Sequence, residues 1–196
     1  MVLIGLRLLL LRVLIRFLVM RPVCHILADA GANAVYVWAG VPDGTTDPLV
    51  TLQVNEPSRL SSDGTWLAVN STTEHEVMLY EVDQVTTPGY SPFDGGAPSP
   101  GVEREFYLSD GATVSHGHLF IAHIERSQIW VWEDVVDAIE DRPPDAILGA
   151  SGVSDTQPEI SRNQVFWPAA ASFDGSYLWV GEVKFSSRLV RFSPTG

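Results

Sequence analysis

The sequence contains one cysteine, Cys24, and only 12 Lys and Arg residues against 24 Asp and Glu in 196 residues. A single thiol excludes a disulfide framework within the chain and leaves the cellular compartment open. The formal net charge of −12 repels phosphate backbones, so we expect no nucleic acid partner. The ordinary interpretation of such acidity is a solvated, soluble surface, and cationic partners or metal ions are compatible with it.

Common catalytic motifs and helical periodicity are also missing. The sequence has no G-x-S-x-G elbow and no H-E-x-x-H pair. Apolar residues recur with helical spacing only in residues 133–141, where Val135, Val136 and Ile139 share one face and the prolines that follow would end a helix. We therefore predict an all-β chain with one short connecting helix and no catalytic residues.

Four copies of one unit recur along the chain. In each copy a short apolar strand ends on a polar residue, crosses a hydrophilic turn and restarts as a second apolar strand that carries aromatic residues. Continuous or alternating apolar residues rich in Trp, Tyr, Val and Ile are typical of half-buried strands. The copies are residues 25–38, 67–82, 119–135 and 178–194.

Flanking segments extend each copy to four strands. The triplets SDG, SHG and FDG precede three copies, and their glycines can supply the positive φ of a tight turn. Four antiparallel strands in about 40 to 60 residues match one blade of a β-propeller. The further strands are expected at residues 57–62, 111–115 and 168–173 before the turns, and at residues 47–52, 103–108 and 144–149 after the hairpins.

The predicted fold is therefore an all-β propeller with about four four-stranded blades, of which the first and last are incomplete. Propellers typically have about 4 to 8 blades, so we expect an open or partial ring. Such a ring would be a fragment of a larger one, or an arc closed by strand exchange or by another subunit, and open blade edges favour self-association. The blades are expected at about residues 23–53, 57–108, 111–149 and 167–194.

Residues 1–22 form an apolar segment ahead of the blades. Arg7, Arg12 and Arg16 divide it into runs shorter than the apolar core of about 7 to 15 residues in a signal peptide. A membrane-spanning helix would bury two or three arginines at about 2.5 to 3.5 kcal/mol each. Two alternatives stay open: a degenerate export signal or membrane anchor, or an atypical start in which residues 13–19 form a strand of the first blade. Exported, membrane-proximal and cytoplasmic locations are all compatible with the sequence, and membrane association is expected only through this segment.

The order of motifs resembles that of bacterial NHL-repeat β-propellers. In that family a turn Gly leads into an L-[YF]-V-A-D strand, a polar turn, a V-x-V-[WF] strand, a Pro-containing loop and a P-[AD]-x-V-L-G segment. Residues 26–52 and 142–192 follow this order, and the match extends over about residues 25–194. The family's strand-end Asp is present only at Asp29 and its turn Arg is clearly retained only as Arg188, so functional residues do not transfer position by position.

Four polar residues at the ends of hairpin strands are candidate site residues: Asp29, Asn70, His123 and Glu182. On successive blades they could surround one rim of the ring. Short polar side chains at a strand end also accept hydrogen bonds from the turn that follows, and we expect this structural role, especially for Asp29 and Asn70.

His116, His118 and His123 form the local histidine cluster and are weak candidates for a Zn or Ca site. In related propeller enzymes, amidating lyases and lactonase-like hydrolases, a metal is held in the central channel by His, Asp, Asn or Glu. The expected innermost strands here offer hydroxyls and one Arg, so a metal would require ligands from another blade. We predict no cofactor and expect the histidines to make local hydrogen bonds.

The six tryptophans are expected mainly between blades. Trp66 and Trp167 lie next to turns and are the candidates for exposure and for contact with a glycan. The carboxylates of residues 134–141 fall three or four apart on the expected helix and are predicted to form a solvated face.

These features favour a non-catalytic binding or scaffold propeller over an enzyme. We expect it to recognise a protein, peptide or glycan through one face of the ring, with loops 84–102 and 150–166 as contact elements, because long loops on a rigid scaffold commonly carry function. The alternative is a metal-dependent lyase or lactonase-like hydrolase whose channel site is completed by further blades. A non-functional fragment of a larger gene is a third hypothesis.

Overall fold

The computed structural model describes residues 16–20, 24–71, 74, 76–88, 109–151, 154, 160–184 and 186–193. Its described strands form four antiparallel sheets, each a meander in which successive strands are neighbours, and we call these sheets blades 1 to 4. Blade 1 contains β1 (Arg16–Met20), β2 (Cys24–Asp29), β3 (Ala34–Trp38) and β4 (Val50–Gln53); blade 2 contains β5 (Pro57–Ser62), β6 (Trp66–Ser71) and β7 (Glu76–Glu81); blade 3 contains β8 (Ser109–Ser115), β9 (His118–His123), β10 (Gln128–Trp132) and β11 (Ala146–Leu148); blade 4 contains β12 (Pro168–Phe173), β13 (Leu178–Glu182) and β14 (Leu189–Phe192).

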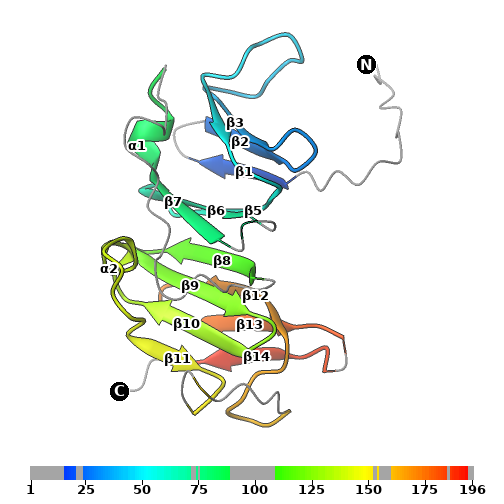
Figure 1. The fold of residues 1–196 in the computed structure, drawn as a ribbon, viewed down its shortest axis with the longest axis vertical. Coiled ribbons are helices and arrows are strands. Elements are labelled where there is room, and N and C mark those ends of the chain that lie inside the picture. Colours follow the sequence, from blue (N-terminus) through cyan, green and yellow to red (C-terminus); the bar gives the residue numbers. More distant parts are fainter. Residues whose placement is uncertain are drawn as a thin grey trace.

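The blades follow one another in an arc. The first strands β1, β5, β8 and β12 lie side by side in chain order and form the inner wall of the arc. Figure 1 shows blade 1 at one end of the molecule and blades 3 and 4 at the other. The predicted all-β fold of small antiparallel sheets is confirmed, and the arrangement is that of propeller blades in an open arc.

Each pair of neighbouring blades encloses its own hydrophobic core. Side chains on a strand alternate between the two faces of a sheet, so a middle strand contributes to two cores. On β9, Leu119 and Ile121 pack toward blade 2, whereas Phe120 and Ala122 pack toward blade 4. The continuous apolar run of β9 is thus explained by burial on both faces.

The inner strands share one irregularity. The pairing of β5 with β6, of β8 with β9 and of β12 with β13 shifts by one residue near the start of each inner strand. The residues just before Pro57 and Pro168, Glu56 and Trp167, both have a positive φ, of 39° and 47°. Bulges of this kind bend a strand and increase its twist, as a curved inner wall requires.

The hairpin turns between first and second strands differ in type. The two-residue loop of blade 3, His116–Gly117, has a positive φ at both positions, 55° and 79°, as in a type I′ turn. In blades 2 and 4 only the first loop residue, Gly64 or Gly175, has a positive φ, as in a type II′ turn. Glycine therefore occupies the second loop position in blade 3 and the first in the others, so an alignment on glycine is one residue out of register.

Helices lie only in connections within the described residues. α2 (Val135–Ile139) falls in the predicted helical segment, and Asp134 caps it by accepting a hydrogen bond from Val136 N. The sequence analysis missed α1 (Val82–Val85), a single turn whose Val82 and Val85 belong to the core between blades 1 and 2. No helix in the described ranges is long and apolar enough to cross a membrane.

The predicted first and fourth strands of the blades agree with the structure to different degrees. β1 covers part of residues 13–19 and pairs antiparallel with β2. Blade 1 was expected to be incomplete, but with β1 it has four strands. β11 lies within the strand expected at 144–149, whereas β4 overlaps the strand expected at 47–52 and extends one residue beyond it. The strand expected at 103–108 lies outside the described residues.

Candidate functional site

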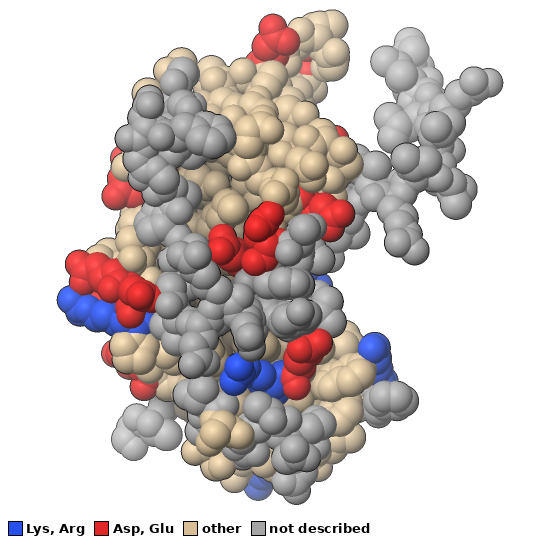
Figure 2. Space-filling model, in the orientation of Figure 1, with Lys and Arg blue, Asp and Glu red and all other residues tan. Residues whose placement is uncertain are grey.

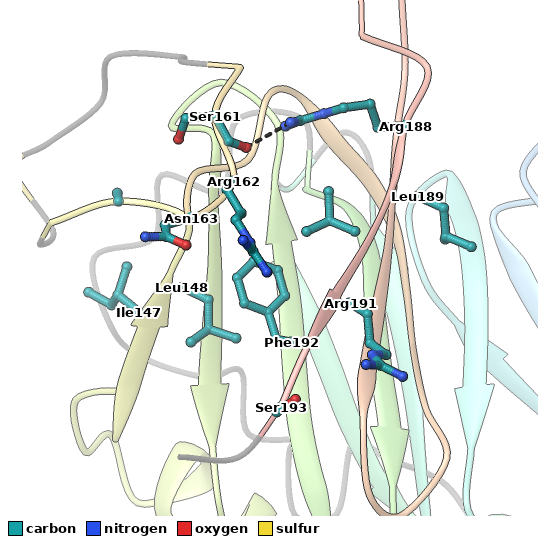
Figure 3. A pocket seen from close by; sticks show the side chains of 13 residues that line it. Ile147, Leu148, Ser161, Arg162, Asn163, Arg188, Leu189, Arg191, Phe192 and Ser193 are labelled. Carbon is teal, nitrogen blue, oxygen red and sulfur yellow. Dashed lines mark hydrogen bonds between the residues drawn. The ribbon is translucent and has the colours of Figure 1, made fainter.

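A cavity of about 650 Å³ lies between β11 and β14. One long edge of β14 pairs with β13, and no strand in the described part of the chain pairs with the other edge. Residues of β11 and of the loop before β12 complete the wall, and Figure 3 shows these residues around the cavity. We call this cavity the β14 groove. Its lining residues are Ile147, Leu148, Gly149, Ala150, Ser161, Arg162, Asn163 and residues 188–193.

Arg188 holds the two walls of the β14 groove together. Its guanidinium donates to both carboxylate oxygens of Glu182, at 2.8 and 2.7 Å, and to the backbone oxygens of Ser161 and Gln164, at 2.7 and 3.2 Å. Glu182 also accepts a hydrogen bond from Phe166 N at 2.9 Å. The loop at residues 161–166 is therefore fixed against blade 4 by charge-assisted hydrogen bonds.

Glu182 is held in its ionised form. Burial alone would raise the pKa of this carboxyl, but the hydrogen bonds from Arg188 and Phe166 N and the charge of Arg188 outweigh it, so the pKa is lowered. The same contacts raise the pKa of Arg188. The ion pair is thus a structural link between the walls of the groove.

Arg162 supplies an uncommitted positive charge. It is exposed and makes no ion pair with any described residue, and Figure 3 shows its side chain lying between β11 and β14. Arg191 is also exposed, but its guanidinium stacks over the rings of Tyr177 and Trp179, at 4.4 and 5.6 Å from their centroids. Among the described residues, the groove thus combines a strand edge without a pairing strand and the exposed guanidinium of Arg162.

A second cavity of about 270 Å³ lies on the inner wall of the arc. It is lined by Arg59 and by small residues of β5, β8 and β12. The hydroxyls here bond between blades: Val114 N donates to Ser61 Oγ at 3.0 Å, and Thr113 Oγ1 donates to Ala171 O at 2.8 Å. The polar groups of the inner strands therefore join neighbouring blades.

Three of the four strand-end candidates, Asn70, His123 and Glu182, are buried. Strand pairing places Asp29, Ser71, His123 and Glu182 at equivalent positions, because each lies opposite the first residue of the next strand or just beyond it. Asn70 lies one residue earlier, owing to the difference in turn type. Of the four predicted candidates, Asp29 accepts from Ala32 N in its own turn, whereas Asn70 accepts from Ala112 N of blade 3, both at 3.0 Å.

The three histidines of the predicted cluster are not brought together. His118 and His123 occupy opposite ends of β9, about 16 Å apart at the usual rise of a strand. His116 and His118 flank Phe173 of blade 4 in edge-on contacts, and His123 is buried against Trp130. Among the described residues, no three His, Cys, Asp or Glu side chains group as metal ligands.

The two tryptophans expected at the surface are half-buried. Trp66 packs against the core between blades 2 and 3. Trp167 stacks on Phe166, with ring centroids 5.6 Å apart, and Lys184 Nζ lies 3.9 Å from its ring centroid. Both rings thus already make contacts within the protein.

The sequence analysis missed Arg162 as a site residue. No motif surrounds it, and only its position in the predicted contact loop 150–166 could have singled it out. The groove itself depends on the absence of a pairing strand beside β14, which no local pattern in residues 189–192 reveals.

No protein-family model and no curated protein sequence matches the chain. Solved structures resemble it in fold. The computationally designed Ika8 protein superposes with a TM-score of 0.56 and 10% sequence identity; the match covers 93% of this chain and 46% of Ika8. The designed Ika4 protein superposes with a TM-score of 0.55 and 10% identity; the match covers 97% of this chain and 96% of Ika4. Kuenenia stuttgartiensis hydrazine synthase superposes with a TM-score of 0.54 and 12% identity; the match covers 87% of this chain and 42% of that protein. The chain thus spans less than half of two of these structures and nearly all of the third, and at such identities the likeness shows the fold alone.

Proposed function

We propose that this chain is a non-catalytic binding scaffold, a propeller arc of the NHL-repeat type, and that the β14 groove takes up an extended peptide segment bearing carboxylates. The observation that carries the proposal is the position of Arg162 beside the unpaired edge of β14 (Figure 3). The NHL assignment is supported by the order of motifs along the chain together with the four small antiparallel sheets.

An unpaired strand edge favours a peptide over other ligands. An extended segment can add to such an edge through main-chain hydrogen bonds, while pockets beside the edge select alternate side chains. The cavity of about 650 Å³ leaves room beside β14, and Ile147 and Leu148 offer apolar contacts on the opposite wall. The groove therefore provides both the backbone partners and the side-chain contacts of strand addition.

Charge determines the chemistry of the segment. Arg162 presents a guanidinium whose planar donors match a carboxylate in a bidentate manner. Arg188 is already bonded to Glu182, so its charge is balanced locally. A carboxylate side chain of a peptide bound along β14 would therefore pair with the guanidinium of Arg162.

Binding of labelled peptides measured by fluorescence anisotropy tests the proposal. The probes are a Val/Thr-rich heptapeptide with three Glu residues and the same peptide with Lys in their place. We expect saturable binding of the Glu peptide, about tenfold weaker binding by Arg162→Glu, and unchanged binding by the control Arg142→Glu, whose guanidinium pairs with Asp137 and Glu140 away from the groove.

Equal binding of both peptides, or none at millimolar concentration, would contradict the proposal. A stoichiometric Zn or Ca in the purified protein, together with hydrolytic or lyase activity, would favour the channel enzyme instead.

A further inference from the structure

The outer faces of blades 1 and 4 carry the same kinds of side chain that the inner blades bury against each other. Leu189 of β14 is equivalent by strand pairing to Val35 of β3, Val77 of β7 and Ile129 of β10. These three are 0% exposed because each packs against the next blade, whereas Leu189 is 68% exposed. Blade 4 thus presents a surface of the type that a following blade covers.

The inner strand of blade 4 repeats the pattern. Ser61 and Thr113 both bond to the backbone of the next inner strand. Ser172 of β12 is the equivalent residue, since it pairs with Trp179 as Ser61 pairs with Ala68 and Thr113 with Phe120. The side chain of Ser172 is exposed. The hydroxyl that joins one blade to the next is therefore present at the open end of the arc.

Blade 1 presents the complementary surface. Its Tyr36 and Trp38 are equivalent to Trp130 and Trp132 of blade 3, which are 1% and 0% exposed because they pack against blade 2. Tyr36 and Trp38 point away from blade 2 and are only half-buried, with their rings 5.7 Å apart. Blade 1 therefore has the face that a preceding blade would cover.

The charges of the two end blades are opposite. Residues 16–54 contain two Arg and three Asp, a net charge of −1, whereas residues 160–193 contain four Lys and Arg against two acidic residues, a net charge of +2. Figure 2 shows acidic side chains and no described basic ones over the end that holds blade 1, and both basic and acidic side chains over the end that holds blades 3 and 4. Opposite charges steer such surfaces toward each other.

We propose that two copies of this chain join head to tail, blade 4 of each against blade 1 of the other, and close one ring. The exposed surfaces are rich in Trp, Tyr and Arg, the residues enriched in protein interfaces. A head-to-tail contact closes a two-membered ring when each chain supplies half of the turn. The cavity beside Arg59 then becomes half of a central channel.

Sedimentation and light scattering of the intact chain at tens of micromolar test this assembly. We expect a particle of twice the 21.5 kDa chain mass. Leu189→Arg on blade 4 and Thr51→Arg, beside Tyr36 on the outer face of blade 1, should each weaken dimerisation at least tenfold. Both side chains are exposed, so the variants should keep the near-ultraviolet dichroism of the parent. Val41→Arg, at a loop position 76% exposed, is the matched control.

A mixture of the two variants distinguishes the geometry. In a head-to-tail ring the mixed dimer retains one unmodified contact, so mixing Leu189→Arg with Thr51→Arg should restore part of the dimer. A monomer, a polymer that lengthens with concentration, or a dimer insensitive to Thr51→Arg would overturn the proposal. Leu189 also lines the β14 groove, whereas Thr51 does not. Loss of the dimer in Thr51→Arg with peptide binding retained therefore separates this proposal from the proposed function.

Discussion

Asp63 in the turn of blade 2 accepts a hydrogen bond from the backbone N–H of Gly117 in the turn of blade 3, at 2.8 Å. The other carboxylate oxygen accepts from Thr65 N and Trp66 N, both at 3.0 Å. Burial would raise the pKa of Asp63, but the N–H groups of Trp66, Gly117 and Thr65 outweigh it and lower the pKa. One carboxylate therefore fixes its own hairpin and links two blades.

Replacing Asp63 by Asn should make stability less dependent on pH. A carboxyl whose pKa is lowered by folding stabilises the protein above its unfolded pKa of about 3.9, and this stability is lost as the pH falls through the folded value. We expect Asp63→Asn to cost about 1 kcal/mol at pH 7, since solvent screens this partly exposed group, and the deficit to shrink below pH ~4. Urea denaturation from pH 2 to 7 measures this. The exposed Asp47→Asn serves as the control, and an equal deficit at all pH values would contradict the prediction.

Removing the Arg188 side chain should destabilise blade 4. Arg188→Met leaves the carboxylate of Glu182, whose side chain is 0% exposed, without its charged partner. A lost hydrogen bond to a charged group costs about 1.5 to 3 kcal/mol. The matched change Arg142→Met removes exposed surface ion pairs and should cost less than about 0.5 kcal/mol. Thermal unfolding of both variants gives the comparison, and similar losses would show that the Glu182 pair is not stabilising.

Adding one methyl group at Gly149 should disturb the junction between β11 and the loop before blade 4. A Cβ there would lie 2.3 Å from Val165 Cγ2, and the φ of 84° already disfavours other residues. Gly44 has a similar φ of 89° but open space around it. We therefore expect Gly149→Ala to cost about 1 to 3 kcal/mol more than Gly44→Ala. Equal costs in denaturant unfolding would refute the role of Val165.

The hydroxyl of Thr113 should stabilise the contact between blades 3 and 4. Thr113→Val keeps the shape of the side chain but removes its hydrogen bond to Ala171 O, which should cost about 1 kcal/mol. Thr51→Val changes an exposed residue of β4 in the same way and should be close to neutral. Chemical denaturation of both proteins checks the difference. A neutral Thr113→Val would mean that solvent replaces this hydrogen bond without loss.

The blade pattern could be predicted from sequence because burial on both faces leaves continuous apolar strands between recognisable turns. The inner strands at 57–62 and 168–173 coincide with β5 and β12. The register of the hairpins could not be predicted in the same way. A glycine gives a turn in either loop position, and only the φ values of His116 and Gly117 reveal the type I′ turn that makes Ser71, not Asn70, equivalent to His123.

The candidate site was less accessible to sequence analysis than the fold. Loop 150–166 was predicted to make contacts, and part of it does line the β14 groove. Arg162 becomes a candidate binding residue only because it lies beside the unpaired edge of β14, which is more than 25 residues later in the chain. Similarly, Leu189 looks like any core residue of a repeat, and its exposure follows only from the lack of a following blade among the described residues.

The sharing of cores by middle strands has a consequence for how the protein opens. β6 and β9 each contribute to two cores, whereas β2 and β13 each contribute to one. In a linear array the units with neighbours on both sides lose structure last. Amide protons of β6 and β9 should therefore exchange with deuterium most slowly in a single copy of the chain. Equal protection of all four blades would instead indicate a closed ring, in which every blade has two neighbours.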